Sequence, residues 1–592
     1  MARKISKRDL KGVAEQITDE LRRRESGTER KHLEKVWKEV DRQVRMEAPV
    51  NTSQDPSDAW MPNIEMPFQF NALEIIDADA RQLMFPEGQE WYQVHAELTD
   101  EYADRVERDP PFKDRKPEKF EVDQEFANLV VHAVLDWFHS QYPFREMWGK
   151  CRIEAIKYGN LIGRAVANTP DVISRSYRGS SGLKIPMFVA GTIRDTFLDD
   201  RIQAVMHEGL MVQPDCIQRV YQNLNDLKRA ARAENRGWLP GQLEGLEAKT
   251  EGPKRGTVEL IRFEGDLFVP RSRGEDIYLP SQKILVAVGN EARVVRLEDA
   301  EDFRSEIHGT YMLDGSSCPY GVGPLMKGQP LQEAATEAMN RMLQVMALQA
   351  EPPVEWDRND MELLGRGGPK LIPGEQWDAD NPGSTTPMKI GDLPAAQITT
   401  MALAELYEQL TGVNDPRRGG GPKSHTTTGG QQIAASRGVL RTEDFVLDLE
   451  EGPMTDWLYI EYAMAKKLLG KKTITVPLKM RGFEDYITVN GTHLPDRAEF
   501  FVNGASGILS KREQRDNWLA VSSVIGQFVP AALQGVIPPD LVREIIAETF
   551  AQFGIADSQR FTRALEGGPG GTASGPQIPE IGGLVEGANP IP

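Results

Sequence analysis

Cysteine is scarce in this chain, and its three cysteines, Cys151, Cys216 and Cys318, are far apart. No two of them form a CxxC pair, and three is an odd number for a set of disulfide bonds. The sequence therefore gives no support to a disulfide-stapled fold. We expect free thiols, as in a protein of a reducing cytoplasm.

Long apolar runs are also missing. No uninterrupted stretch approaches the ~18 residues that a membrane span needs. Residues 1–8 are charged and no apolar segment follows them, so no signal peptide is expected. We therefore predict a soluble protein that is made in a cytoplasm and has no membrane partner.

Basic residues are outnumbered. Lys and Arg total 70 against 89 Asp and Glu, which gives a formal net charge of −19. A protein that reads DNA grooves normally has a basic footprint, so this chain as a whole does not fit that class. An acidic surface repels phosphate and prevents sticking, which suits a conduit for DNA better than a clamp.

Motifs of catalysis are missing as well. The segment 419–424, Gly-Gly-Gly-Pro-Lys-Ser, differs from a phosphate-binding loop because Pro422 stands where that motif needs glycine. No Gly-x-Ser-x-Gly elbow occurs, and nothing indicates a cysteine nucleophile. We expect no enzymatic activity and no cofactor.

Some polar groups could bind metal ions. His132, Asp136 and His139 have helical spacing and could share one ion, but a polar flank beside a core stripe is the favoured interpretation. Three acidic groups could bind divalent cations, although solvated faces or the lining of a passage are favoured. These groups are Asp199 with Asp200, Asp378 with Asp380, and Asp448 with Glu450 and Glu451.

The apolar pattern predicts a helix-rich α+β protein. Residues 6–48 indicate a charged, helical stretch whose apolar stripe should pack on a partner or a neighbouring subunit. Residues 68–167 are mainly helical, with one helix over 148–167. Residues 171–295 indicate short, mostly antiparallel strands around a helix at 213–235. The apolar stripe of residues 6–48 consists of Leu33, Val36, Trp37, Val40 and Val44.

The middle of the chain predicts two helices. Pro330 suits the first turn of a helix that Pro352-Pro353 ends. Its narrow apolar seam should pack helix on helix against neighbouring subunits. A second helix is expected to begin near Pro394. The seam comprises Leu331, Ala335, Ala338, Met342 and Val345.

The segment between these helices, 351–394, is rich in proline and glycine and can have little core of its own. It contains strand candidates at 354–356 and 369–372. Trp356 and Trp377 are the expected anchors for a protein partner, because aromatic residues dominate interface hot spots. They could equally form the core of this module.

A polar, glycine-rich loop over 412–430 follows the second helix. Its compact cationic group could touch phosphate transiently, or it could be a solvated loop with incidental charge. A helical pattern resumes at about 431–469, where Gly452-Pro453 must kink or break it. Strands are expected over 473–502. The cationic group is Arg417, Arg418, Lys423 and His425.

Four segments carry a family resemblance. They are Tyr158-Gly-Asn-Leu-Ile-Gly-Arg-Ala-Val with Asp195-Thr-Phe-Leu-Asp-Asp200, Tyr320-Gly-Val-Gly-Pro-Leu-Met-Lys-Gly-Gln-Pro-Leu-Gln332, Leu406-Tyr-Glu-Gln-Leu-Thr-Gly-Val-Asn-Asp415, and Thr428-Gly-Gly-Gln-Gln-Ile-Ala-Ala-Ser436. In this order they resemble the wing segment, the approach to the first stem helix, the second stem helix and the start of the tunnel helix of tailed-bacteriophage portal proteins, the head-to-tail connectors.

The resemblance implies a portal fold with wing, stem, clip, tunnel loop, tunnel helix and crown, assembled as a cyclic ring that is usually a dodecamer. The implied division is 1–324 wing, 325–350 first stem helix, 351–394 clip, 395–411 second stem helix, 412–430 tunnel loop, 431–509 tunnel helix and returning wing strands, 510–566 helical crown, and 567–592 a disordered Gly/Pro-rich tail.

The resemblance also implies a function. The ring would sit at one capsid vertex of the virion, after assembly in the host cytoplasm, and double-stranded DNA would be packaged and ejected through it. The implied partners are the terminase large subunit, a head–tail adaptor, and the major capsid and scaffolding proteins. The alternatives are a packaging motor or nuclease subunit, and a structural adaptor that binds protein alone.

Overall fold

The computed structural model divides the chain into two compact units, residues 1–505 and 506–592, and all described residues belong to the first. The described residues are 7–49, 60–86, 90–112, 122–168, 183–201, 206–207, 210–211, 215–233, 237–248, 255–269, 276–289, 291–300, 304–311, 319–351, 354–357, 376–379, 394–413, 440–480 and 483–504. The predicted crown and tail lie outside them.

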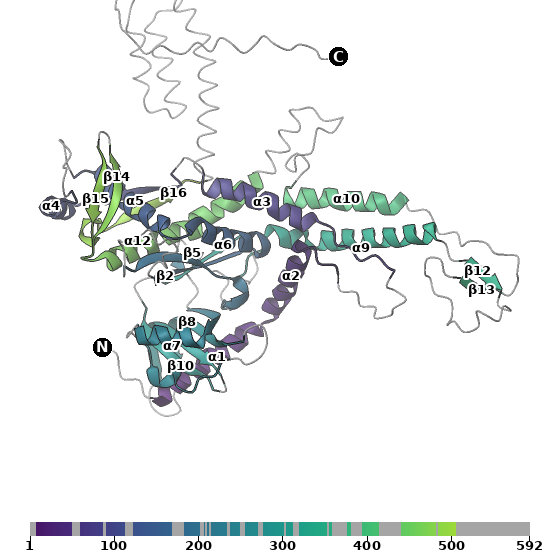
Figure 1. The fold of residues 1–592 in the computed structure, drawn as a ribbon, viewed down its shortest axis with the longest axis horizontal. Coiled ribbons are helices and arrows are strands. Elements are labelled where there is room, and N and C mark those ends of the chain that lie inside the picture. The colour runs from purple at the N-terminus through teal and green to yellow at the C-terminus, as the bar shows by residue number, and fades with distance from the viewer. Residues whose placement is uncertain are drawn as a thin grey trace, which may run out of the picture. The chain divides into compact units, whose positions relative to one another are not determined.

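The described part is a mixture of helices and strands (Figure 1). The helices are α1 (Lys7–Glu25), α2 (Thr28–Val44), α3 (Phe68–Met84), α4 (Asp100–Arg108), α5 (Gln124–Ser140), α6 (Phe144–Tyr158), α7 (Leu224–Ala233), α8 (Pro240–Leu243), α9 (Pro324–Ala350), α10 (Pro394–Thr411) and α12 (Thr455–Leu469), and residues 440–449 are also helical. This mixture agrees with the predicted helix-rich α+β class.

The strands pair mainly antiparallel, as predicted. They are β1 (Tyr92–Ala96), β2 (Asn160–Asn168), β3 (Ile185–Ala190), β4 (Thr196–Phe197), β5 (Met206–His207), β6 (Leu210–Met211), β7 (Asp215–Asn223), β8 (Thr257–Val269), β9 (Ile277–Val288), β10 (Arg293–Asp299), β11 (Glu306–Thr310), β12 (Val354–Asp357), β13 (Gln376–Ala379), β14 (Ile474–Met480), β15 (Phe483–Val489) and β16 (Ala498–Val502). Among the described pairs, β12 and β13 alone run parallel.

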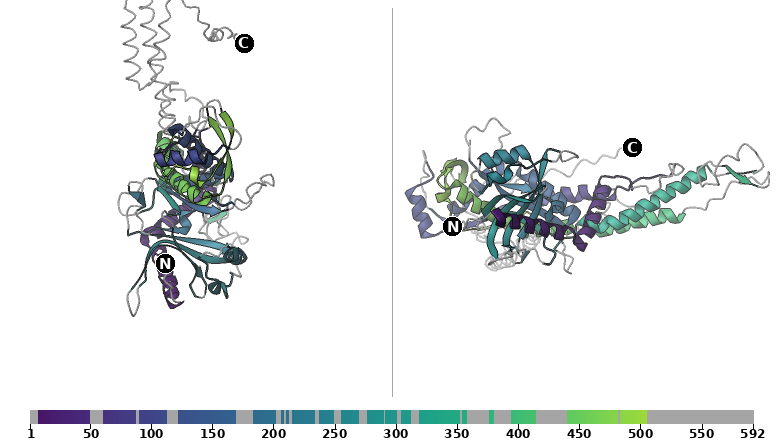
Figure 2. Two further views of the ribbon diagram at one scale, coloured as in Figure 1. Left: turned by 90° about the vertical axis from the view of Figure 1, so that its left-hand side faces the viewer. Right: turned by 90° about the horizontal axis from the view of Figure 1, so that it is seen from below.

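The largest sheet has five strands in the order β10-β9-β8-β7-β4. Side chains alternate across a strand, so its two faces build two separate cores. Ile261 and Phe263 of β8 pack with Val13 and Ile17 of α1, which crosses one face of the sheet (Figure 2). On the other face, Leu260 packs with side chains of α7 and α8.

A three-stranded sheet, β11-β2-β3, contradicts the helix expected over 148–167. The helix α6 ends at Tyr158, and Gly159 follows with a left-handed φ of 71°. Any side chain there would be strained and would also collide with the chain, since a Cβ would lie 2.4 Å from Val322 N. Residues 160–168 then form β2, because β11 and β3 pair with it on both sides. Tertiary pairing overrides the local helical pattern.

Two further predictions need correction. The helix expected at 213–235 is a strand, β7, in its first half and a helix, α7, in its second. The helical stretch expected over 6–48 is confirmed and consists of two helices, which separate at Ser26-Gly27. The apolar stripe of α2, which was expected to pack on a partner, is instead covered within this chain. Its Trp37 is fully buried against Tyr158 and Tyr320.

The predicted interruption at Gly452-Pro453 is a π-helical turn over Glu450–Met454 and not a break. Pro453 lacks an N–H, so one carbonyl of the preceding turn loses its usual donor. In the same turn, Thr455 Oγ1 donates to Glu450 O at 2.6 Å. The helix continues as α12 to Leu469, and the strands expected over 473–502 follow as β14, β15 and β16.

Two smaller expectations can be checked on the described part of the chain. Cys151 and Cys216 are buried free thiols, as predicted, whereas Cys318 lies outside the described residues. No helix within the described ranges combines the length and the apolar character that a bilayer crossing requires.

His308 in β11 should make the protein sensitive to acid. Its side chain is buried, neither ring nitrogen has a hydrogen-bond partner, and burial lowers its pKa to about 3. The unfolded chain takes up a proton below about pH 6.5 while the folded chain does not, so stability falls as pH falls, by up to ~1.4 kcal/mol per pH unit.

We therefore expect wild type to lose about 2 kcal/mol more than His308→Leu between pH 7.5 and 5.0, measured by urea unfolding. His32→Gln, which removes an exposed histidine, should behave like wild type. Equal losses in wild type and His308→Leu would contradict the assignment.

Candidate functional site

The helices α9 and α10 lie side by side as a hairpin (Figure 1 and the right view of Figure 2). They correspond to the two helices predicted in the middle of the chain. α10 begins at Pro394, as expected, but α9 begins at Pro324 and contains Pro330. Pro324 occupies the first helical position, where a missing N–H costs little. The packing of the first turns outweighs the hydrogen bond lost at Pro330.

Close contact between glycines joins the base of the hairpin to the sheet. A Cβ on Gly321 would lie 2.1 Å from Gly159 O, and one on Gly323 would lie 2.7 Å from Ile156 O. Gly321 N donates to Asn160 Oδ1 at 3.1 Å. The segment of the family resemblance that begins at Tyr158 is therefore in contact with the segment over 320–332. Glycine is required on both sides of this contact.

A second close contact joins the two helices of the hairpin. A Cβ on Gly328 of α9 would lie 2.5 Å from Cε2 of Tyr407 on α10. The Tyr407 ring is fully buried and lies 5.3 Å, centroid to centroid, from the ring of Phe68. This contact places the segment of the resemblance over 406–415 against the segment over 320–332.

A polar row on α9, which the sequence analysis missed, fixes the helix to the segment before α3. Gln332, Thr336 and Asn340 are four residues apart and share one face. Gln332 Nε2 and Thr336 Oγ1 donate to the buried Glu65 carboxylate at 2.5 and 3.2 Å. Asn340 accepts from Ile64 N and donates to Ile64 O, both at 3.0 Å. The regular four-residue spacing of polar residues was the available signal.

The predicted seam of α9 is only partly available to a neighbour. Ala335 is fully buried within this chain, so the expectation that the whole seam requires another subunit is wrong at that position. The polar row and α10 already enclose this part of the helix. The other four seam residues, Leu331, Ala338, Met342 and Val345, are half-buried.

An exposed apolar row runs along α10. Ala402, Leu406 and Leu410 are four residues apart and exposed, with 49% of Leu406 and 41% of Leu410 accessible. Leu440 is 55% exposed, and the next residue, Arg441, donates from Nη1 to Leu410 O at 2.7 Å. We call Ala402, Leu406, Leu410 and Leu440 the α10 stripe.

An acidic row lies on the helix that follows. Asp444, Asp448 and Glu451 are exposed at spacings of four and three residues, on one face. Burial, together with repulsion from Asp444 and Glu451, raises the pKa of Asp448 to about 6. Glu450, which the sequence analysis grouped with Asp448 and Glu451, is buried. Asp448 and Glu451 are exposed, as a solvated face requires, and Asp444, which the sequence analysis did not name, completes the row.

The Asp199-Asp200 pair is part of the structure's own ion-pair network and not a cation site. Asp199 Oδ1 lies 2.9 Å from Arg23 Nη2, and its Oδ2 lies 2.6 Å from Arg201 Nη2. Asp200 pairs with Arg23 at 2.8 Å. Of the remaining acidic pair, Asp378 lies on β13 and Asp380 lies outside the described residues.

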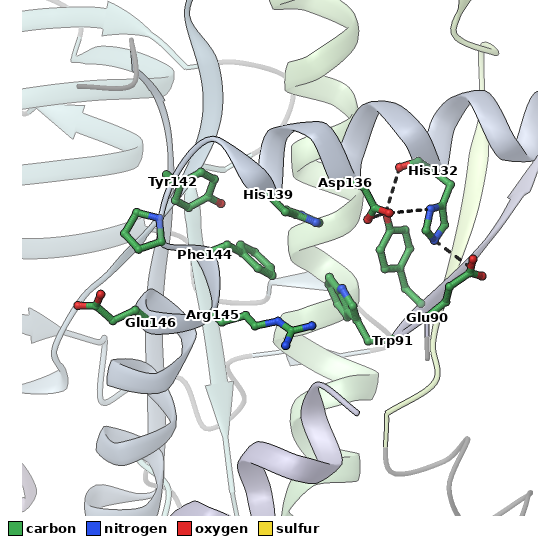
Figure 3. A pocket seen from close by; sticks show the side chains of 11 residues that line it. Glu90, Trp91, His132, Asp136, His139, Tyr142, Phe144, Arg145 and Glu146 are labelled. Atoms are coloured by element: carbon green, nitrogen blue, oxygen red, sulfur yellow. Dashed lines mark hydrogen bonds and ion pairs between the residues drawn. The ribbon is translucent and has the colours of Figure 1, made fainter. Parts of the chain in front are cut away.

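The predicted histidine group lines a cavity of about 560 Å³ (Figure 3). His132 Nδ1 lies 3.1 Å from Asp136 Oδ2, and His139 Nε2 lies 2.8 Å from Glu461 Oε2 on α12. The two imidazoles thus face different carboxylates. Within the described ranges, no three acidic, histidine or cysteine side chains gather as metal ligands.

Several predicted site residues cannot be placed. Arg417, Arg418, Lys423 and His425 lie outside the described residues, as does the strand candidate 369–372. Trp356 lies on β12, and Trp377 lies on β13, where the second strand of the module was not expected. The roles assigned to all of these residues stay predictions.

Comparison of the chain with protein-family models and with curated proteins finds no match.

Proposed function

We propose that this chain is the portal protein of a tailed bacteriophage, the subunit of a ring through which double-stranded DNA is packaged and ejected. The hairpin of α9 and α10 carries the proposal. It is joined to an α+β body at its base, and the α10 stripe leaves leucines exposed in a regular row. A monomer gains nothing from such a row. A cyclic interface, in which each hairpin packs against the next, would cover it.

The acidic row supports a passage for DNA. Repeated around a ring, Asp444, Asp448 and Glu451 would repel phosphate and keep DNA from adhering to the wall. The loop 412–430 connects α10 to this helix in the sequence. Its cationic group would then supply weak, salt-sensitive phosphate contacts inside an otherwise acidic channel.

The proposal assigns the remaining partners to other parts of the chain. The module that contains β12 and β13 follows α9 directly, and Trp356 and Trp377 are its candidate anchors for the terminase large subunit and the head–tail adaptor. The ring would sit at a capsid vertex of the virion, in contact with major capsid and scaffolding proteins. No catalytic step is assigned to the chain.

The direct test is the native mass of the purified full chain, with negative-stain images of the same sample. A closed ring of many copies, usually twelve in this family, with a central hole is the expected result. A stable monomer at micromolar concentration would remove the proposal. The measurement needs no phage partner, so it tests this chain alone.

The loop carries a separate prediction. Replacing Arg417, Arg418 and Lys423 together with alanine should leave ring mass unchanged and reduce DNA retention in filled heads several-fold, because each lost cation removes a phosphate contact. Phage produced with the variant would be assayed for packaged DNA. Exposed cations elsewhere, changed as Arg22→Ala and Arg229→Ala, provide a control. Normal retention would favour the alternative of an adaptor that binds protein alone.

A further inference from the structure

A second cavity, of about 800 Å³, lies between the two sheets. Its walls come from β2, from β8, β9 and β10 of the five-stranded sheet, and from the last turn of α12. These elements are far apart in the sequence, and no motif pointed to the cavity. Its volume falls within the ~300–1,000 Å³ that is typical of sites for small ligands.

The lining is strongly basic in a protein that is acidic overall. Six basic side chains face two carboxylates, an excess of four positive charges, whereas the whole chain carries −19. The basic residues are Arg164, Lys184, Arg262, Lys283, Arg296 and Lys467, and the carboxylates are Glu264 and Glu298. Such a concentration of one charge inside a concave surface focuses the field on an anion.

The strand register explains how the charges gather. Arg262 of β8 pairs with Leu285 of β9, which pairs with Arg296 of β10. Residues paired across antiparallel strands point to the same face, so this row projects two guanidinium groups from one side of the sheet. The neighbouring row, Glu264, Lys283 and Glu298, is paired in the same way.

The two carboxylates are already engaged. Glu264 accepts from Ser305 N at 2.7 Å and lies 3.6 Å from Lys283 Nζ. Glu298 Oε1 lies 2.9 Å from Arg296 Nη2. Arg262 has a neutral partner, since its Nη1 donates to Gln218 Oε1 at 3.3 Å. The carboxylates therefore do not balance the positive charge of the cavity.

Among the cations of the cavity, Arg164 on β2 has the positive charge that nearby groups compensate least. Its Nε is buried and makes no hydrogen bond. Burial lowers the pKa of Arg164, and the nearby carboxylates Glu264 and Glu306 act on it through space only. Burial also raises the pKa of Glu306 to about 7, so this neighbour is only partly ionised near neutral pH. A half-buried guanidinium with no bonded anion carries a desolvation cost, and a bound anion would relieve that cost.

We propose that this cavity binds a phosphate-bearing anion of nucleotide size. Guanidinium groups match phosphate oxygens in a bidentate fork, which makes arginine the preferred residue for such recognition. Apart from Ser305, the rest of the lining is apolar and would accept the non-phosphate part of the ligand, mainly through Val166, Ile284, Leu285, Met464 and Leu468. The same chemistry is offered by a free nucleotide and by a single nucleic-acid strand. The site is independent of the α10 stripe and of the proposed ring.

Calorimetric titration of the full chain tests the assignment, with ATP, an oligothymidine of about ten nucleotides and a poly-glutamate peptide as separate probes. We expect saturable binding of ATP or of the oligonucleotide, weakened at least tenfold by Arg164→Gln. Arg341→Gln is the matched control, because Arg341 is 73% exposed on α9. Binding of ATP would indicate a nucleotide site, and binding of the oligonucleotide alone would indicate a strand.

Thermal unfolding without ligand keeps the test independent of a folding defect. Arg164→Met removes the uncompensated charge, so the ligand-free variant should be at least as stable as wild type while the stabilisation by ligand is lost. Three results would each overturn the proposal: no saturable binding of ATP or oligonucleotide, equal affinity in Arg164→Gln and Arg341→Gln, or binding of the acidic peptide alone.

Discussion

Replacing Leu406 with glutamate is expected to abolish ring assembly while the monomer stays folded. Leu406 is 49% exposed in the single chain, so the substitution removes little core, and exposed substitutions of this kind change stability by about 0.5 kcal/mol or less. In a hairpin-to-hairpin interface the same carboxylate would be buried without a partner, at a cost of several kcal/mol. Every subunit contact of the ring would carry that cost.

The measurement is the native mass of the variant, together with its circular dichroism and melting temperature. Gln409→Glu is the matched control, because it adds the same charge to the same helix on a neighbouring row that already contains Glu405. The control should form rings. Leu410→Glu, on the same row as Leu406, should repeat the loss. Intact rings in both leucine variants would show that the α10 stripe is not the subunit interface.

Replacing Arg30 with methionine is expected to lower the free energy of unfolding by roughly 3–5 kcal/mol. Arg30 is buried on α2, where its Nη1 donates to Ile193 O at 3.0 Å and Thr196 O at 2.9 Å, and its Nη2 donates to Arg194 O at 2.7 Å. Methionine keeps the apolar stem but leaves these carbonyls without their donor.

The same guanidinium also lies over three aromatic rings, so its loss removes cation–π contacts in a dry environment. Its Cζ is 4.8 Å from the ring centroid of Trp37, 4.7 Å from that of Phe197 and 5.5 Å from that of Tyr320. Arg22→Met, which removes a 72% exposed arginine from α1, is the control and should change stability by about 0.5 kcal/mol or less. Urea unfolding of both variants measures the effect, and similar losses would contradict a special role for Arg30.

The sequence alone determined the elements whose signals are local. Proline at the first position of α10, apolar spacing along both helices of the hairpin, and turn residues between β14, β15 and β16 all act within a few residues. Those elements form where the sequence predicts them, except that α9 begins at Pro324 and not at Pro330. The exposed acidic face was predicted only in part: Asp448 and Glu451 lie on it, whereas Glu450 is buried and Asp444 was not named.

Tertiary structure decided everything that depends on pairing between distant segments. A helical pattern over 148–167 became β2 because two strands pair with it, and the stripe around Trp37 became core because Tyr158 and Tyr320 cover it. The basic cavity has no linear motif, since strand register places Arg262 and Arg296 in one row on either side of Leu285, and β2 of the other sheet supplies the facing wall. Burial, strand register and charge compensation all depend on contacts between segments that are distant in the sequence. A local sequence pattern specifies which side chains are available for such contacts, but not which of them meet.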